Sequence, residues 1–563
     1  ARSGVGACTA CAAVVGAVDC NSGPVDSSIW ESKDWTPADA AAITILMRAD
    51  DARAQGRTIL GYIEDSAFAQ LEFEPVPRTS HAHAAKGLID FVQCLIEARA
   101  GFVARAGAKA APRLDVSTRT MTATAWTGDS IRLAIAPGEA SACGNHGSSL
   151  YPEIVVFAGK DHREVVARLR DNRPYSDGPC RCVLMGKSTT MPERRAAAVQ
   201  SLETSGEPWL VREDQGIYFF ALPFGGDLGF VFTGAAAAYS RMGEDLLTAV
   251  PEAVELLKRR FTKLPELVRW VYDGSTNARR PEELLAGSAM LCQLHYEISR
   301  NFLSVRPRAS IGLSSGETNG IIAFGAWNDL DPLFDEIKES RMYSHHLAGD
   351  FQVVRDRFKR LGIPYNQWTN WRVLAPLDAI RAAVAQTPGT YITIVNTHKD
   401  VVIGGDIRLC ERIIKDLGAT ATPLGHDMAI HCPVVEDYAH AWRAVHVRET
   451  NPVGDVRFYA SAFDKHFVPT SENIADALLG QAIDYYDFPK VVEMAYRDGV
   501  RVFVEHGPRA LCTGWIKDIL GNRPHFGVIM DRDRRRSDVE QVFHVAALLY
   551  AAGVPVNLTW LNG

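Results

Sequence analysis

From residue 228 onward, short apolar runs alternate with amphipathic segments, and this alternation constrains the fold most strongly. The run Leu-Gly-Phe-Val-Phe at 228–232 contains no polar side chain, which is typical of a strand buried on both faces of a parallel sheet. Residues 310–312 and 502–505 are predicted to be further strands, and helical spacing predominates between them. Strands that alternate with helices in this way predict a doubly wound α/β domain.

Residues 372–425 form an insert with a pattern of their own. Apolar β-branched runs and helical runs alternate there in the order βαββαβ, which is typical of a ferredoxin-like fold. The predicted elements are a strand at 371–374, a helix at 377–386, a hairpin-like pair at 391–395 and 401–403, a helix at 406–417 and a strand near 420–424.

A smaller α/β unit precedes this domain. Clusters of Pro and Gly at 136–152 and 222–229 mark its two ends. Its predicted elements are strands at 153–158, 181–185 and 217–220 and helices at 161–170 and 192–203. We therefore expect domain boundaries that give the segments 1–150, 151–224, 225–371, 372–425, 426–530 and 531–563.

Composition excludes several classes of protein. The chain has 563 residues, 47% of them hydrophobic and 23% charged, as expected for a globular protein of several domains. The formal net charge is −7 and no basic block occurs, so we expect no nucleic-acid partner. No apolar run has the length of a membrane helix, and we expect a cytoplasmic location. The chain starts Ala1-Arg2-Ser3-Gly4, without a start Met, which leaves open that it is a fragment.

The cysteines and histidines do not form a metal-binding pattern. A zinc site needs two cysteine pairs, or one pair with histidines at fixed spacing, and a zincin needs a Glu between its histidines. We therefore predict free thiols and no metal. The pairs in question are Cys8/Cys11, Cys180/Cys182, His81/His83 and His345/His346.

The most informative stretch is Gly312-Leu313-Ser314-Ser315-Gly316. It matches G-x-S-x-G between a predicted strand and a helical run, which predicts a nucleophile elbow. The glycines permit the tight turn that lifts the Ser314 hydroxyl above the sheet, at the positive end of a helix. The N–H of Ser315 would then face a developing oxyanion.

Four segments in the same order resemble the motifs of the acyltransferase domains of fatty-acid and polyketide synthases. His431 follows Ser314 by 117 residues, with the ferredoxin-like insert between them, as in that family. The resemblance covers roughly 225–563 and ends in a tail similar to the post-acyltransferase linker. The matching segments are F-V-F-T-G at 230–234, G-L-S-S-G-E at 312–317, A-I-H-C-P at 429–433 and V-E-H-G-P-R-A-L-C-T at 504–513.

The resemblance implies an α/β-hydrolase-like core and a two-step acyl transfer. Ser314 is the implied nucleophile and His431 the base that takes its proton. The backbone N–H groups of Ser315 and Ala235 form the implied oxyanion hole. The substrates are acyl-CoA or a phosphopantetheinyl acyl carrier protein, with no bound cofactor. The implied partners are the carrier protein and other synthase domains or subunits, while a homodimer is left open.

Departures from the family pattern bear on the substrate. Leu313 replaces a polar His before the nucleophile, so we expect a less polar acyl pocket. Malonyl-selective members carry an Arg 25 residues after the serine, where this chain has Glu339. Arg341 is an alternative clamp, and Asn396 is also expected at the substrate. These residues predict a preference for neutral acyl groups. Three segments look most like the acyltransferase of polyunsaturated fatty acid synthases: the Ala-rich opener at 235–238, residues 314–319 and residues 323–327.

The N-terminal third contains weaker resemblances, to the thiolase-like fold of ketosynthases. The segments involved are 12–19, 41–64, 80–88 and 145–149. No cysteine has a clear nucleophile context, and the H-G-T-G-T segment is missing. We therefore predict a truncated, degenerate region of the chain-length-factor type, and an unrelated α/β scaffold remains the alternative.

Two other functions stay open from the sequence. A thioesterase-like hydrolase would use the same dyad with water as the acceptor. A non-catalytic docking scaffold would be favoured by a broken elbow, but the motif here is intact.

Overall fold

The computed structural model describes residues 152–272, 280–328 and 330–562, and before them only the backbone of short strands. The chain divides into two compact units, 1–143 with 244–255, and 144–243 with 256–563. The early strands are β1 Ala12–Asp19, β2 Ala40–Met47, β3 Gly61–Ile63, β4 Phe102–Val103, β5 Ala111–Pro112, β6 Arg119–Thr124 and β7 Ser130–Pro137.

In the first unit, β1 pairs with β2 and β7 lies between β3 and β6, all antiparallel. The ketosynthase-like segment 12–19 is a strand, as predicted. The segments 80–88 and 145–149 lie outside the described residues. The ketosynthase-like character of this region therefore stays a prediction.

The second unit begins with the small α/β unit, whose sheet has the antiparallel order β10-β11-β9-β8. The predicted strands and helices are all present, and the four-residue β10 is an addition. It escaped the sequence analysis because it is a short edge strand whose Trp209 is 46% exposed. The elements are β8 Glu153–Gly159, α5 His162–Asp171, β9 Cys180–Gly186, α6 Met191–Thr204, β10 Trp209–Arg212 and β11 Ile217–Phe220.

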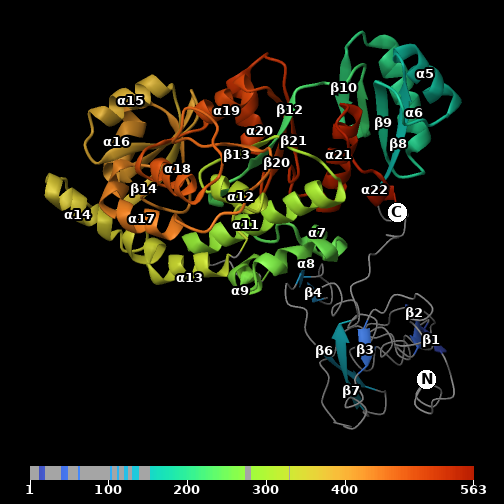
Figure 1. The fold of residues 1–563 in the computed structure, drawn as a ribbon, viewed down its shortest axis with the longest axis horizontal. Helices are drawn as coiled ribbons and strands as arrows, with labels where there is room; N and C mark the ends of the chain where they lie inside the picture. The colour runs from blue at the N-terminus through green and yellow to red at the C-terminus, as the bar shows by residue number, and fades with distance from the viewer. Residues whose placement is uncertain are drawn as a thin grey trace, which may run out of the picture. The chain divides into compact units, whose positions relative to one another are not determined.

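Helix α21 (Asp538–Ala551) packs against β9 and β11 of this small sheet (Figure 1). Arg181 donates from Nη1 to the carbonyl of Tyr550 over 3.0 Å, and its guanidinium lies 4.7 Å from the Tyr550 ring centroid. Helix α21 thus completes the fold of residues 151–224.

The doubly wound domain has a five-stranded sheet in the order β18-β13-β12-β20-β21, in which every pair is parallel. This confirms the predicted α/β class, and Val231, Ile311 and Phe503 are fully buried in its core. Helices cover both faces of the sheet (Figure 1). The strands are β12 Asp227–Phe232, β13 Ala309–Gly312, β18 Arg457–Tyr459, β20 Val500–His506 and β21 Phe526–Ile529.

The remaining helices come from distant parts of the chain. They are α7 Glu244–Ala249, α8 Pro251–Arg260, α9 Leu264–Leu267, α10 Arg269–Tyr272, α11 Pro281–Glu297, α12 Gly316–Ala323, α13 Asp331–Glu339, α14 Gln352–Leu361, α17 Ala439–His446, α18 Ser471–Ile483, α19 Phe488–Arg497, α20 Cys512–Leu520 and α22 Thr559–Asn562.

The insert forms a second sheet, with the antiparallel order β17-β14-β16-β15 of a ferredoxin-like fold. The two-residue β19 (Tyr486–Asp487) then joins β15 in parallel. This strand belongs to the following segment, so it connects the insert to the larger domain. The elements are β14 Trp368–Leu374, α15 Leu377–Ala385, β15 Thr390–Thr397, β16 Asp400–Asp406, α16 Ile407–Leu417 and β17 Thr420–Pro423.

Candidate active site

The turn between β13 and α12 has the geometry of a nucleophile elbow. Ser314 adopts a left-handed φ of 56°, a strained conformation that non-glycine residues rarely hold. A Cβ at Gly312 would lie 2.1 Å from the backbone nitrogen of Glu317, and one at Gly316 would lie 2.1 Å from the carbonyl oxygen of Phe232. Both positions therefore require glycine, and the two glycines hold Ser314 at the carboxyl edge of the sheet.

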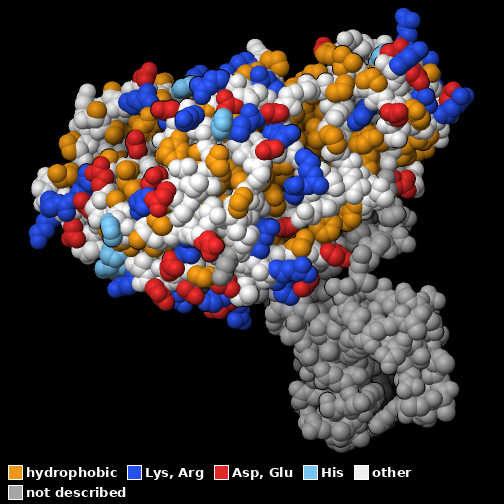
Figure 2. All heavy atoms as spheres, viewed as in Figure 1, with side chains coloured by type: hydrophobic (Ala, Val, Ile, Leu, Met, Phe, Trp, Pro, Cys, Tyr) orange, Lys and Arg blue, Asp and Glu red, His pale blue; other side chains and the backbone are white. Residues whose placement is uncertain are grey.

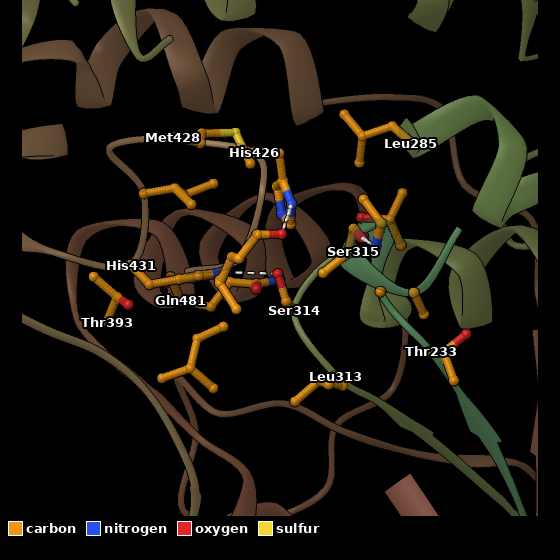
Figure 3. Close-up of a pocket in the computed structure, with 18 of the residues that line it drawn as sticks. Thr233, Leu285, Leu313, Ser314, Ser315, Thr393, His426, Met428, His431 and Gln481 are labelled. Atoms are coloured by element: carbon orange, nitrogen blue, oxygen red, sulfur yellow. Dashed lines mark hydrogen bonds between the residues drawn. The ribbon is translucent and has the colours of Figure 1, made fainter. Parts of the chain in front are cut away.

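Ser314 and His431 form a hydrogen-bonded pair (Figure 3). Ser314 Oγ lies 2.7 Å from His431 Nε2, and His431 Nδ1 lies 2.5 Å from the carbonyl oxygen of Gln481. Because a carbonyl can only accept, the imidazole carries its hydrogen on Nδ1 and accepts from Ser314 at Nε2. Burial lowers the pKa of His431 to about 4, so the ring is neutral and able to take a proton near pH 7.

Glu317 ties the elbow to the helix that orients His431. Its Oε1 accepts from the N–H of Ser461 over 2.9 Å and its Oε2 from Gln481 Nε2 over 3.0 Å. Tyr486 adds a hydroxyl 2.9 Å from Oε1. Burial raises the pKa of Glu317 to about 8. The motif residue Glu317 thus positions Gln481, whose carbonyl holds His431. Gln481 gave no sequence signal, because it acts through its backbone.

The two expected oxyanion-hole residues lie next to each other. Ala235 opens a short 3-10 turn (Ala235–Ala237) directly after β12. Its N–H, however, donates to the hydroxyl of Ser315 over 2.9 Å. Ser315 precedes the first residue of α12, and the first N–H groups of a helix have no partner within it. The two expected donors thus lie together at the elbow, but the Ala235 N–H is occupied by the Ser315 side chain.

The pair faces a cavity of about 360 Å³. Leu313 and Asn396, which the sequence analysis expected at the substrate, are among the residues that line it. Polar groups come from the elbow, the ferredoxin-like sheet and the loops after β17 and β20, and apolar groups come mainly from the surrounding helices. The apolar lining includes Leu285, Ala289, Leu333, Phe334, Ile337, Tyr343, Met428, Ile430, Trp442 and Leu478.

An ion pair stabilises the polar side of the cavity. Arg372 donates from Nε to Asp400 Oδ1 over 2.9 Å. Asp400 also accepts from Asn396 Nδ2 over 3.0 Å and from Trp515 Nε1 over 2.9 Å. Asn396 is therefore held by Asp400 at the cavity wall. The sequence analysis missed Arg372 and Asp400, which lie 28 residues apart and meet only across the sheet.

A second cation at the cavity is Arg509, on the loop after β20. Among the described residues, nothing accepts from its buried Nε–H. The guanidinium carbons of Arg509 and Arg534 lie 6.0 Å and 5.1 Å from the centroid of the Tyr239 ring. Burial and the neighbouring Arg534 lower the pKa of Arg509. The sequence analysis did not predict that Arg509 and Arg534 lie near each other.

Glu339 and Arg341, which the sequence analysis expected at the substrate, lie outside the cavity lining. Glu339 is the exposed last residue of α13, and the side chain of Arg341 is 62% exposed, 4.0 Å from Asp350. The spacing from Ser314 was counted through the non-helical turn before α13, so it fixed no direction for either side chain.

The metal candidates can be placed in part. Cys180 and Cys182 are buried free thiols, and burial raises the pKa of Cys180 to about 11. His345 lies 2.7 Å from Asp350. The described residues contain no group of three potential metal ligands. Cys8, Cys11, His81 and His83 lie outside the described residues.

The charges on the surface and the character of the helices bear on what a membrane or nucleic-acid partner requires. On the face shown in Figure 2, basic and acidic side chains are interspersed over the described part of the molecule. In that same part, no helix combines the length and the apolar character that crossing a membrane requires.

No family model matches the chain. It is 26% identical over 337 residues to one subunit of the polyunsaturated fatty acid synthase of Thraustochytrium sp., an alignment that covers 54% of this chain and 16% of the relative. It is 25% identical to 5-methyl-1-naphthoate synthase of Streptomyces sahachiroi, covering 59% and 18%. The chain thus spans less than a fifth of the length of these relatives.

Solved structures give the same picture of the fold. The acyltransferase domain from the second module of the salinomycin polyketide synthase matches with a TM-score of 0.54 and 20% identity, covering 71% of this chain and 89% of that one. The acyltransferase domain of SpnD matches with a TM-score of 0.55 and 14% identity, covering 72% and 98%. The chain is thus similar in sequence to polyunsaturated fatty acid and polyketide synthases, and its fold is that of the acyltransferase domains in these solved structures.

Proposed function

We propose that residues 225–563 form an acyltransferase. It moves an acyl group from a thioester donor, through an ester on Ser314, to the phosphopantetheine thiol of an acyl carrier protein. The observation that carries this proposal is the 2.7 Å hydrogen bond between Ser314 Oγ and a neutral, buried His431. A serine hydroxyl is a weak nucleophile unless a positioned base takes its proton.

In the first step, Ser314 Oγ attacks the thioester carbonyl while its proton passes to His431 Nε2. The oxygen of the tetrahedral intermediate becomes negative, and the N–H groups of Ser315 and Ala235 are the donors placed to hold it. The intermediate collapses to the acyl-serine, and His431 returns the proton to the leaving thiol. Throughout, the Gln481 carbonyl accepts from Nδ1 and steadies the positive ring. It does so as a dipole, where a triad would use a carboxylate.

In the second step, the carrier-protein thiol takes the place of the first thiol. His431 removes the thiol proton, the sulfur attacks the ester, and Ser314 leaves with the proton from His431. Water in place of the thiol would turn the same sequence into a hydrolase reaction. The intact hydrogen-bonded pair weighs against a purely structural scaffold.

The acyl group that fits this cavity is neutral and apolar. Leu313 beside the nucleophile and the aromatic and aliphatic lining on the helices offer no partner to the free carboxylate of a malonyl group. Of the two guanidinium groups at the cavity, that of Arg372 is neutralised by Asp400. A lost charge-assisted hydrogen bond costs about 1.5–3 kcal/mol, so a neutral acyl-CoA should load about tenfold faster than malonyl-CoA. Preferential malonyl loading that Arg509→Ala abolishes would instead make Arg509 the carboxylate clamp.

The remaining segments suit a role within a multidomain synthase. We place the acyltransferase large subdomain at 225–371 and 426–530, its small subdomain at 372–425, and linkers at 151–224 and 531–563. The degenerate ketosynthase-like region 1–150 would dock neighbouring domains. The partners would be a carrier protein and other synthase domains or subunits, in the cytoplasm.

Intact-mass measurement tests the proposal. The protein is mixed with acetyl-CoA or octanoyl-CoA, and holo carrier protein is then added. An acyl adduct that passes to the carrier supports the transferase. Release of free acid without transfer supports the hydrolase. No adduct with any thioester, together with unchanged binding of a neighbouring synthase domain in Ser314→Ala, supports the scaffold.

A further inference from the structure

The Ser315 side chain occupies one donor of the oxyanion hole, and this has a consequence for the reaction. We propose that the Ser315 hydroxyl is a plug that closes the hole in the resting protein and must rotate away before acyl transfer. The inference rests on the proposed function, since it concerns how the same site is switched on.

The position of the hydroxyl supports a plug. An oxyanion-hole donor acts over about 2.7–3.1 Å, and Ser315 Oγ lies 2.9 Å from the nitrogen of Ala235. The hydroxyl therefore stands at the distance where the oxyanion would stand. A Cβ built at Gly234 would lie 3.4 Å from this Oγ and 3.7 Å from the Cβ of Ser314. The hydroxyl thus sits beside the nucleophile, in the gap between the end of β12 and the elbow.

One N–H cannot serve two acceptors at full strength. Ala235 N–H has a single hydrogen, and a hydrogen bond weakens steeply as its angle departs from linear. An oxyanion arriving beside Ser315 Oγ would find this donor already used. The transition state would then be stabilised by a hydrogen bond from the Ser315 N–H only, and the hydrogen bond from the Ala235 N–H would form only after the hydroxyl moves.

The hydroxyl can move without disturbing the fold. Ser315 is only half-buried and lines the cavity, so another staggered rotamer can point its Oγ into open space. The cost is one neutral hydrogen bond, which has a small net value. A water molecule in the same place would exchange freely, whereas the tethered hydroxyl returns after every turnover.

A plug also limits hydrolysis. While Ser315 occupies the Ala235 N–H, the carbonyl oxygen of an acyl-serine is polarised by one donor instead of two. Water attack on the ester is slower in that state. The plugged hole would therefore prolong the life of the acyl-enzyme until an acceptor thiol arrives.

The competing interpretation gives the opposite sign. Ser315 could donate its own O–H to the oxyanion and act as a third donor. Removal of the hydroxyl would then slow the reaction. Ser315→Ala separates the two, because a plug predicts acceleration and a donor predicts loss of rate.

The test compares wild-type protein, Ser315→Ala and Ser344→Ala under single-turnover conditions with acetyl-CoA and octanoyl-CoA. Ser344 is exposed and lies outside the cavity lining, so its variant controls for loss of a hydroxyl as such. We expect Ser315→Ala to load Ser314 about three- to tenfold faster at saturating donor, the factor that one released neutral hydrogen bond gives. The KM and the thermal unfolding midpoint should stay unchanged, and free-acid release should rise by a similar factor.

A serine-directed fluorophosphonate supplies an independent probe. Ser314 Oγ forms the bond to phosphorus, fluoride leaves, and the Ser314 proton passes to His431. Because the phosphoryl oxygen needs the same hole, Ser315→Ala should label faster by the same factor. If the wild-type protein is labelled and the Ser315→Ala variant is labelled at an equal or slower rate, the plug alone is overturned. Absence of any adduct on Ser314 in both proteins would overturn the proposed function and the plug together.

Discussion

Two parts of the chain differ in how well the sequence predicts their place in the structure. One is the elbow at 312–317, and the other is the segment that follows it, through α13 to Arg341. Both were assigned roles by position relative to Ser314. The structure places Ser314 and Ser315 at the cavity and leaves Glu339 and Arg341 exposed outside it. A motif carries geometry only as far as its own backbone conformation extends.

The physical reason lies in the contacts of the backbone. Within the elbow, Gly312 and Gly316 approach neighbouring backbone so closely that no other residue fits. The positions of all five motif residues are therefore coupled. Between Ala323 and Asp331 the chain leaves α12 and turns before α13 begins. A count of residues across such a turn fixes neither the direction nor the depth of a side chain.

The largest expected effect is that of Ser314→Ala. Loss of the hydroxyl should abolish acyl loading, because no other side chain at the elbow lies within hydrogen-bond reach of His431. The unfolding midpoint should change little, since Ser314 is only half-buried. Peptide mapping after incubation with acyl-CoA checks this. An adduct at Ser315 in this variant would show that the elbow presents a different nucleophile.

His431→Ala should slow loading by about 10²–10⁴-fold, the usual value of a positioned general base. Stopped-flow or quenched intact-mass kinetics would measure this. The matched variant is His506→Ala, which removes another buried, neutral histidine from the same domain, one that does not line the cavity. A similar loss in both variants would point to a folding defect in place of base catalysis.

Glu317→Ala should destabilise the elbow from within. The variant leaves the Gln481 amide and the Ser461 N–H without their acceptor in a buried site, and each orphaned group costs about 1–3 kcal/mol. We expect about 3 kcal/mol of lost unfolding free energy in urea titrations, together with slower loading as His431 loses its support. Glu317→Gln keeps one acceptor oxygen and should lose less than half as much. Equal effects would mean that side-chain volume, not the hydrogen bonds, matters.

The acid limb of the loading rate reports the environment of His431. Its pKa is lowered from 6.5 to about 4 by burial, so the neutral, active form persists as pH falls below 6.5. The rate at low substrate should stay level from pH 7 to about 5 and fall tenfold only near pH 3, below the folded pKa. Rates measured in overlapping buffers, with folding monitored by fluorescence, would show this. An inflection at 6.5 would mean that His431 is solvated in the free protein.

The smallest effects belong to the segment outside the cavity. Glu339→Arg and Arg341→Ala should each change the ratio of malonyl to octanoyl loading by less than about twofold, because exposed charges at a distance are screened. Competition between the two CoA esters measures the ratio. A fivefold or larger shift in either variant would restore this segment to the binding site.

Much of this molecule followed from local sequence. Continuous apolar runs predicted the parallel strands β12, β13 and β20, and β-branched alternation predicted the insert. The G-x-S-x-G pattern predicted the tight turn that carries Ser314. Each of these features depends on residues that are neighbours in the chain, so its energetics can be judged without knowing the rest of the fold. The strands β10 and β19, which the sequence analysis did not predict, are too short to produce such a pattern.

The tertiary structure decided the geometry in which these distant groups meet. His431 is brought to Ser314 over 117 residues, and its ring is oriented by a backbone carbonyl of Gln481, whose side-chain identity does not specify that role. The Ala235 N–H is 80 residues from the Ser315 hydroxyl that occupies it. Such contacts depend on how sheet edges and helices pack in three dimensions. The sequence therefore determined the nucleophile and its turn, and packing determined the partners that make the nucleophile reactive.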